Sequence, residues 1–166
     1  MDSLFSHAPR GDDEPAGDDA GTPPARHHEV LLPVAPEQAF EGFTEYLHLW
    51  WPVARYSAFG SGTHPAFEDG VVAEEGEDGR RYVWATVEDF TVPTRLSLSF
   101  QMALEQHPPS ALVLAFQAEG DGSTRMVLDH AGWAGGAAGW EQYRKYDGWP
   151  EILGYYARFM GGGAVE

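Results

Sequence analysis

Residues 93–102 read PTRLSLSFQM, and their apolar and polar side chains alternate along the chain. Successive side chains of a β-strand point to opposite faces, so this alternation predicts a strand with one buried face and one solvated face. The buried face would carry Leu96, Leu98, Phe100 and Met102. Such a strand needs neighbouring strands and a second layer that covers its apolar face.

Further strands are predicted on both sides of this segment, with turns at residues 69–70, 76–79 and 119–123 between them. Short turns of this kind join antiparallel strands, so the strands should form a meander. The additional predicted strands cover residues 28–34, 66–67, 71–75, 80–90, 111–118 and 124–130.

Two helical segments flank the strands. Residues 36–47 are predicted to be a helix that ends before Pro52, and residues 140–160 carry apolar side chains at helical spacing. Pro150 interrupts the second segment, so either the helix kinks there or a new helix begins with Asp147 as its N-cap. The predicted class is α+β, with the C-terminal helix covering the sheet, and a gap between these layers suits apolar ligands.

The composition excludes several classes of protein. The chain has 166 residues, 43% of them hydrophobic, which fits one domain with a single core. A net charge of −16 disfavours nucleic acids and anionic lipid surfaces as partners. Because cysteine is absent, disulfides, thiol catalysis and zinc–thiolate sites are excluded.

The first residues differ in composition from the rest. Residues 1–26 are acidic and rich in Pro and Gly, so we expect a disordered tail followed by a folded domain at residues 27–162. The N-terminus lacks the basic start and apolar run of a signal peptide, and no run of about 18 apolar residues could span a membrane. The expectation is a cytoplasmic protein without membrane insertion.

Five motifs appear in order along residues 28–160: PEQAFEGFT, WWP, VWATVEDFTVPTRLSLSF, GDGSTRMVLDHAGW and YDGWPEILGYY. Together they resemble the START-like (SRPBCC) superfamily, which has the helix-grip fold. Within it, the chain is similar to the branch homologous to the C-terminal domain of the activator of the heat-shock-protein-90 ATPase. It departs from this branch at Trp84 and Ala85, where the family usually has Trp-Gly.

The resemblance implies a β-α-α-β6-α fold, in which a curved antiparallel sheet wraps around a long C-terminal helix and encloses a cavity. It implies no single activity, because the superfamily includes lipid carriers, hormone receptors and aromatase/cyclases, and a fold alone does not determine function. The particular branch implies a chaperone partner.

His130 lies in VLDHAGW, residues 127–133, and is the first candidate functional residue. Alternation places it on the same face as Leu128, toward the cavity and near its rim. Asp129 points to the other face, so it cannot orient His130 as a general base. We therefore favour a histidine bonded to a backbone carbonyl or to a tyrosine of the last helix, and we predict no catalytic residue.

Glu74 and Glu75 are neighbours in a predicted strand, so one of them points to the concave face. We interpret a carboxylate there as part of a structural pair with Arg81, Arg95 or a ligand cation, rather than as an acid catalyst. The histidines are scattered, and no two of them have the four-residue spacing of a helical metal site, so no metal or cofactor is predicted.

Aromatic residues make up 13% of the chain and include six tryptophans. Core packing explains most of them, and a pocket for a flat or apolar molecule is the functional interpretation. The predicted ligand-binding residues are Trp50, Trp51, Phe67, Glu74, Tyr82, Trp84, Phe100, His130, Trp133, Trp149 and Tyr156.

Three hypotheses follow. The first is a domain that binds a small apolar or aromatic molecule between sheet and helix, and the second is a co-chaperone-like interaction domain. The third, less favoured, is a cyclase- or dehydratase-type enzyme that uses His130 with an acid such as Glu74. A cavity on the order of a few hundred Å³ would favour the first or third, and a filled core with an exposed apolar patch the second. Two perturbed titratable groups within reach of each other would favour the third.

Overall fold

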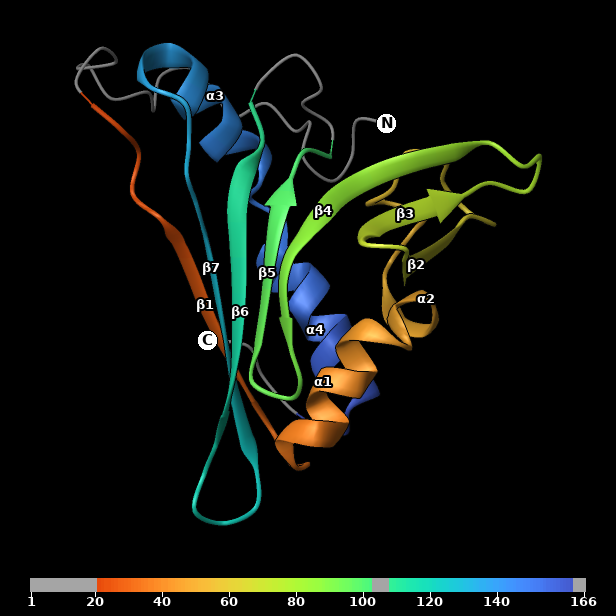
Figure 1. The fold of residues 1–166 in the computed structure, drawn as a ribbon, viewed down its shortest axis with the longest axis vertical. Coiled ribbons are helices and arrows are strands. Elements are labelled where there is room, and N and C mark those ends of the chain that lie inside the picture. Colours follow the sequence, from red (N-terminus) through yellow and green to blue (C-terminus); the bar gives the residue numbers. More distant parts are fainter. Residues whose placement is uncertain (1–20, 103–107, 163–166) are drawn as a thin grey trace.

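The computed structural model describes residues 21–102 and 108–162 and shows a seven-stranded antiparallel sheet with helices packed against it (Figure 1). The predicted α+β helix-grip class is confirmed, with the C-terminal helix bent into two pieces. Most of the predicted tail, residues 1–26, lies outside the described residues. The elements are β1 (Arg26–Leu32), α1 (Pro36–Thr44), α2 (Leu47–Trp50), β2 (His64–Glu68), β3 (Val71–Glu75), β4 (Arg81–Thr91), β5 (Arg95–Phe100), β6 (Ser110–Ala118), β7 (Thr124–Ala131), α3 (Gly136–Lys145) and α4 (Trp149–Phe159).

The strands follow the order β1-β7-β6-β5-β4-β3-β2 across the sheet. Strands β2 to β7 form a meander, and β1 pairs with β7, so β1 and β2 lie at opposite edges. The register aligns apolar side chains across the centre, where Leu114 of β6 lies between Leu96 of β5 and Leu128 of β7. All three are fully buried, which agrees with the alternation of residues 93–102.

Helices α1 and α4 cover the buried face of the sheet, as Figure 1 shows. The Tyr156 hydroxyl of α4 donates a hydrogen bond of 2.6 Å to the Ala39 carbonyl of α1. The Tyr156 ring also packs edge-to-face on Phe43, with 5.2 Å between the ring centroids. The two helices therefore form one layer over the sheet. Within the described chain, no helix is long and apolar enough to cross a membrane.

Both predicted helical segments are divided in the structure. Residues 36–47 form α1 and the start of the short α2, and the C-terminal segment forms α3 and α4. Of the two alternatives at Pro150, the structure has a new helix, but its N-cap is Gly148 and not Asp147. Pro150 lies in the first turn of α4, where no intrahelical bond needs its missing N–H.

A register shift between β3 and β4 decides which side chains face the core. It lies between Val72 and Ala73, opposite the segment of β4 that contains Trp84. As a result, Trp84 and Ala85 are both buried, although strict alternation would place neighbours on opposite faces. This bulge brings the Trp84 ring into the interior beside the neighbouring alanine.

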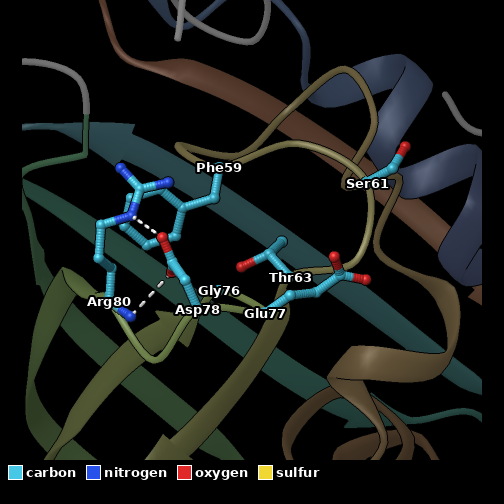
Figure 2. Close-up of a pocket in the computed structure, with 7 residues that line it drawn as sticks. All are labelled: Phe59, Ser61, Thr63, Gly76, Glu77, Asp78 and Arg80. Atoms are coloured by element: carbon cyan, nitrogen blue, oxygen red, sulfur yellow. Dashed lines mark hydrogen bonds and ion pairs between the residues drawn. The ribbon is translucent and has the colours of Figure 1, made fainter.

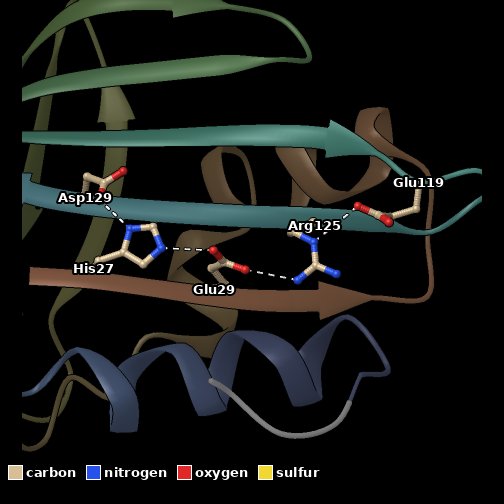
Figure 3. A network of polar contacts seen from close by, with 5 residues as sticks. All are labelled: His27, Glu29, Glu119, Arg125 and Asp129. Atoms are coloured by element: carbon tan, nitrogen blue, oxygen red, sulfur yellow. Dashed lines mark hydrogen bonds and ion pairs between the residues drawn. The ribbon is translucent and has the colours of Figure 1, made fainter.

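A chain of charged side chains joins β1 to β7 on the other face of the sheet (Figure 3). The His27 ring bridges Asp129 at 2.6 Å and Glu29 at 2.9 Å. Arg125 then bridges Glu29 at 3.0 Å and Glu119 at 3.3 Å. His27, a member of this network, lies in β1. This strand begins at Arg26, two residues earlier than the sequence predicted.

Candidate ligand-binding site

A small void lies among the side chains between the sheet and the helices, and we refer to it as the inner void. Its volume is about 20 Å³, which has room for roughly one water molecule. Helices α1 and α4 contribute to its wall, together with α2 and the strands β2 to β6. The lining is apolar and consists of Phe43, Leu47, Trp51, Phe67, Val72, Trp84, Leu98, Phe100, Leu112 and Trp149.

The structure brings part of the predicted set together at this void. Trp50 and Tyr156 are not among its lining residues and pack on each other, with ring centroids 5.0 Å apart. Trp133 instead packs on His130, at 4.7 Å. Tyr82 is half-buried and is not among the lining residues. The five predicted residues that line the inner void are Trp51, Phe67, Trp84, Phe100 and Trp149.

Glu74 is the carboxylate that points inward, and it is fully buried. The predicted pairing with an arginine is wrong, because Arg81 binds Glu68 and Arg95 binds Asp89. Glu74 instead accepts hydrogen bonds from neutral donors. These bonds attach the loop that precedes β2 to strand β4. The donors are the backbone N–H groups of Ala58 (2.8 Å) and Phe59 (2.9 Å), the Thr63 hydroxyl (2.9 Å) and the Trp84 indole (2.6 Å).

His130 is fully buried and both of its ring nitrogens are hydrogen-bonded. The Trp149 indole donates to Nδ1 at 3.1 Å, and because an indole N–H can only donate, Nδ1 carries no proton. The proton is therefore on Nε2, which lies 2.7 Å from the Ser110 hydroxyl oxygen. Ser110 in turn donates to the Phe100 carbonyl at 3.2 Å. The neutral ring thus links α4 to β5 and β6, with partners other than the carbonyl or tyrosine that we expected.

The surroundings of His130 keep it neutral. Burial lowers its pKa well below the ordinary value, and the positive charge of Arg26 acts in the same direction. Its ring lies 4.5 Å from the Tyr146 ring and 5.5 Å from that of Phe100. His130 lies deeper than the predicted rim position and is not among the residues that line the inner void.

Several residues of the site were not singled out by the sequence. Phe43 and Leu47 lie four residues apart within the helix predicted at residues 36–47, and this spacing is typical of the apolar face of a helix and does not indicate a ligand site. Ser110 and Thr63, which bond to His130 and Glu74, belong to no recognisable pattern. The unpredicted residues that line the void are Phe43, Leu47, Val72, Leu98 and Leu112.

An open depression, which we call the outer groove, lies on the other side of Phe67. Its volume is about 340 Å³. The Phe67 and Phe90 rings meet there edge-to-face, with 6.3 Å between their centroids. Phe67 lines both the outer groove and the inner void, so the two spaces meet at this residue. The residues of the outer groove are Phe67, Glu68, Asp69, Gly70, Val71, Val87 and Phe90.

A polar pocket of about 190 Å³ lies beside the β3–β4 turn (Figure 2). Here the Arg80 guanidinium lies over the Phe59 ring, 4.4 Å from its centroid, and binds Asp78 at 2.7 Å. None of the predicted ligand-binding residues lines this pocket. In the two described ranges, no group of three or more His, Asp or Glu side chains is arranged to hold a metal ion.

The curved sheet, the two-piece C-terminal helix and the aromatic interior define a helix-grip domain of the START-like class. A family profile described as "Activator of Hsp90 ATPase homolog 1-like protein" matches residues 33–156. The chain belongs to this family, which confirms the resemblance seen in its motifs. No curated protein sequence matches the chain.

Solved structures of similar fold come from proteins with different roles. The self-sacrificing resistance protein CalC from Micromonospora echinospora has a TM-score of 0.63 and 21% identity, covering 88% of this chain and 98% of its own. The Hsp90 activator PFC0360w from Plasmodium falciparum has a TM-score of 0.57 and 16% identity, covering 84% and 97%. The anthrahydroquino-γ-pyrone synthase Txn09 has a TM-score of 0.50 and 24% identity, covering 82% and 88%. At these identities the likeness shows the fold alone.

Proposed function

We propose that the domain binds a small apolar or aromatic molecule between the sheet and α4. The observation that carries this proposal is the inner void, where six of the ten lining side chains are aromatic. Aromatic side chains present flat apolar faces, and a flat ligand can stack on them without leaving buried polar groups unpaired.

The interior is filled in the described conformation, which by itself favours an interaction domain, so the binding proposal requires that this conformation be a closed form of the site. Pockets for small molecules have volumes of roughly 300 Å³ or more, so a void of about 20 Å³ must widen before a ligand fits. The short elements α2 and β2 are the part of the wall that would move. Phe67, which β2 contributes, is only partly buried, whereas the walls on β4 and β5 are fixed by pairing on both sides.

Glu74 and His130 act as positioning residues in this proposal. Glu74 holds the indole of Trp84, and His130 accepts the indole hydrogen bond of Trp149. Both bonds orient rings that line the inner void. The ligand would therefore contact the rings, and the two polar side chains would keep the rings in place.

A thermal-shift screen tests the proposal with fatty acids, sterols, flavonoids and polyketide-like aromatics. A compound that binds only the folded state raises the melting temperature, and at about 100 times its Kd it adds about 2.7 kcal/mol to the free energy of unfolding. Leu98→Phe narrows the inner void and should reduce the shift, whereas Leu31→Phe makes the same change at an exposed position and should retain it. The absence of a shift with every class, or an undiminished shift in Leu98→Phe, would contradict the proposal.

A chaperone-interaction role is the second candidate, and exposed apolar side chains near the β4–β5 turn favour it. Phe90 is 48% exposed and Val92 61%, and neighbouring exposed apolar groups often mark protein contacts. The test measures the ATPase rate of a heat-shock-90 chaperone with the wild-type domain and with Val92→Asp. Stimulation that the variant loses would support this role, and an unchanged rate with the wild-type domain would remove it. A chaperone-interaction role of this kind fits the cytoplasmic location that the sequence predicts.

A further inference from the structure

We infer that a ligand enters the inner void from the outer groove by displacing the Phe67 ring, and that the groove selects neutral or cationic planar aromatic molecules over anionic ones. This inference rests on the proposed function and adds the route of entry and the ligand class. It follows from four features of the wall that separates the two spaces.

The first feature is that the two spaces share one lining residue, Phe67. This residue lines both spaces, and its backbone pairs with Val72, which lines the inner void. Val71, which precedes Val72 in β3, lines the outer groove. The β2–β3 hairpin is therefore the partition, and the Phe67 ring closes it.

The second feature is that β2 is an edge strand with few partners. It has five residues, lies at the edge of the sheet and pairs with β3 alone among the described strands (Figure 1). On the helix side, the His64 ring at its start stacks on His48 of α2, with 4.4 Å between centroids. Short edge strands with few partners open at lower free energy than central strands.

The third feature is a fixed aromatic surface at the entrance. Phe90 is exposed on the groove side, and its ring packs edge-to-face on the buried Phe40 of α1 at 5.1 Å. The groove volume of about 340 Å³ is large enough for a small planar molecule. A molecule stacked on Phe90 would touch Phe67 before it entered the interior.

The fourth feature is the charge of the groove. Its lining contains two carboxylates, Glu68 and Asp69, and no basic side chain. Glu68 pairs with Arg81 at 3.3 Å, whereas Asp69 has no ion-pair partner among the described residues. An unpaired carboxylate about 6 Å from a ligand cation in water strengthens binding about threefold and weakens the binding of an anion similarly.

The route is tested with 1-pyrenemethanol as a neutral probe, using energy transfer from tryptophan to pyrene in a stopped-flow instrument. We expect Phe67→Ala to increase the association rate constant severalfold and Phe67→Trp to decrease it. Leu49→Ala removes an apolar side chain of α2 that is 58% exposed and lines neither space, and it serves as the control that should leave the rate unchanged. Thermal melting of each variant verifies that it is folded.

The charge preference is tested with matched probes, 1-pyrenemethylammonium and 1-pyreneacetate. The cation should bind more tightly than the anion, and Asp69→Asn should reduce the ratio of the two affinities about ninefold, about threefold from each probe. Asparagine suits the positive φ of 53° at this turn, so the fold should be retained. Asp121→Asn makes the same charge change in the β6–β7 turn and should leave the preference unchanged, which separates a local effect from that of the net charge.

The outcomes separate this inference from the proposed function. If no probe binds to the wild type or to Phe67→Ala, both are overturned. If the probes bind, but association is indifferent to residue 67, the entry route is wrong and the binding function stands. If Asp69→Asn and Asp121→Asn change the preference equally, the groove does not select by charge.

Discussion

At the scale of single residues, two buried polar side chains organise the interior. Glu74 holds Trp84, and His130 holds Trp149. Alternation along a strand needs only local information, and it placed His130 on the inner face and required that one of Glu74 and Glu75 point there. It could not supply their partners, since Thr63 and Ser110 lie in other segments and approach only after the chain has folded.

Glu74→Gln should lower the free energy of unfolding by about 2 kcal/mol, because an amide has one acceptor oxygen and leaves buried donors unpaired. Glu75→Gln is the matched control, since the neighbouring side chain is exposed and its change should have little effect. Urea unfolding of the three proteins measures the difference. Equal stability of the two variants would show that the hydrogen bonds of Glu74 are unimportant.

The buried neutral His130 predicts a loss of stability in acid. The unfolded histidine titrates near a pKa of about 6.5, whereas burial lowers the folded pKa, so the unfolded chain gains protons as pH falls. From pH 7.5 to 5.5 this one group should lower the free energy of unfolding by at most about 1.4 kcal/mol. His130→Gln should remove that part of the pH dependence.

Other histidines also contribute to the pH dependence of stability, so the wild type has to be compared with His130→Gln. Burial lowers the pKa of His28, which therefore acts in the same direction as His130. The His27 ring donates hydrogen bonds to the Asp129 and Glu29 carboxylates, which raises its pKa, so its contribution to stability is present at low pH and is lost as pH rises. Urea unfolding at both pH values measures the total, and an identical pH dependence in wild type and His130→Gln would contradict the assignment.

At the scale of elements, the periodicity of apolar residues predicted those strands and helices that are regular. The alternation of residues 93–102 identified β5 and its buried face, and the apolar spacing after Trp140 identified the C-terminal helices. The bulge that buries Trp84 beside Ala85 was missed, because a bulge arises from the pairing of two strands and not from either sequence alone. The Gly148 cap was missed because Asp147 is the better capping residue by type.

The start of α3 supplies a prediction at this scale. A methyl group at Gly139 would overlap the carbonyl oxygen of Ala134, so Gly139→Ala should destabilise the domain although alanine favours helices. Gly154 lies within α4, and there an added methyl group meets only the end of the Arg158 side chain at an ordinary distance. Gly154→Ala should therefore raise the melting temperature by the equivalent of about 0.5–1 kcal/mol. Both melting temperatures changing in the same direction would contradict this packing.

At the scale of the whole molecule, the motifs predicted the fold class and the family, and both are confirmed. The sequence indicated an aromatic interior but not its degree of filling. Side-chain packing closes the interior to about 20 Å³, and no composition or spacing reports how rings interlock. The open groove beside Phe67 was missed for the same reason, since it depends on how the edge hairpin meets β4.

The most direct test of the binding proposal is the ¹H–¹⁵N spectrum of the tryptophan indoles during titration with 1-pyrenemethanol. The chain has six tryptophans, so each indole reports on one place in the fold. We expect the signals of Trp51, Trp84 and Trp149 to shift, because these rings line the inner void, and that of Trp140 on α3 to stay. Unchanged signals for the three void-lining rings at saturating probe would contradict the account.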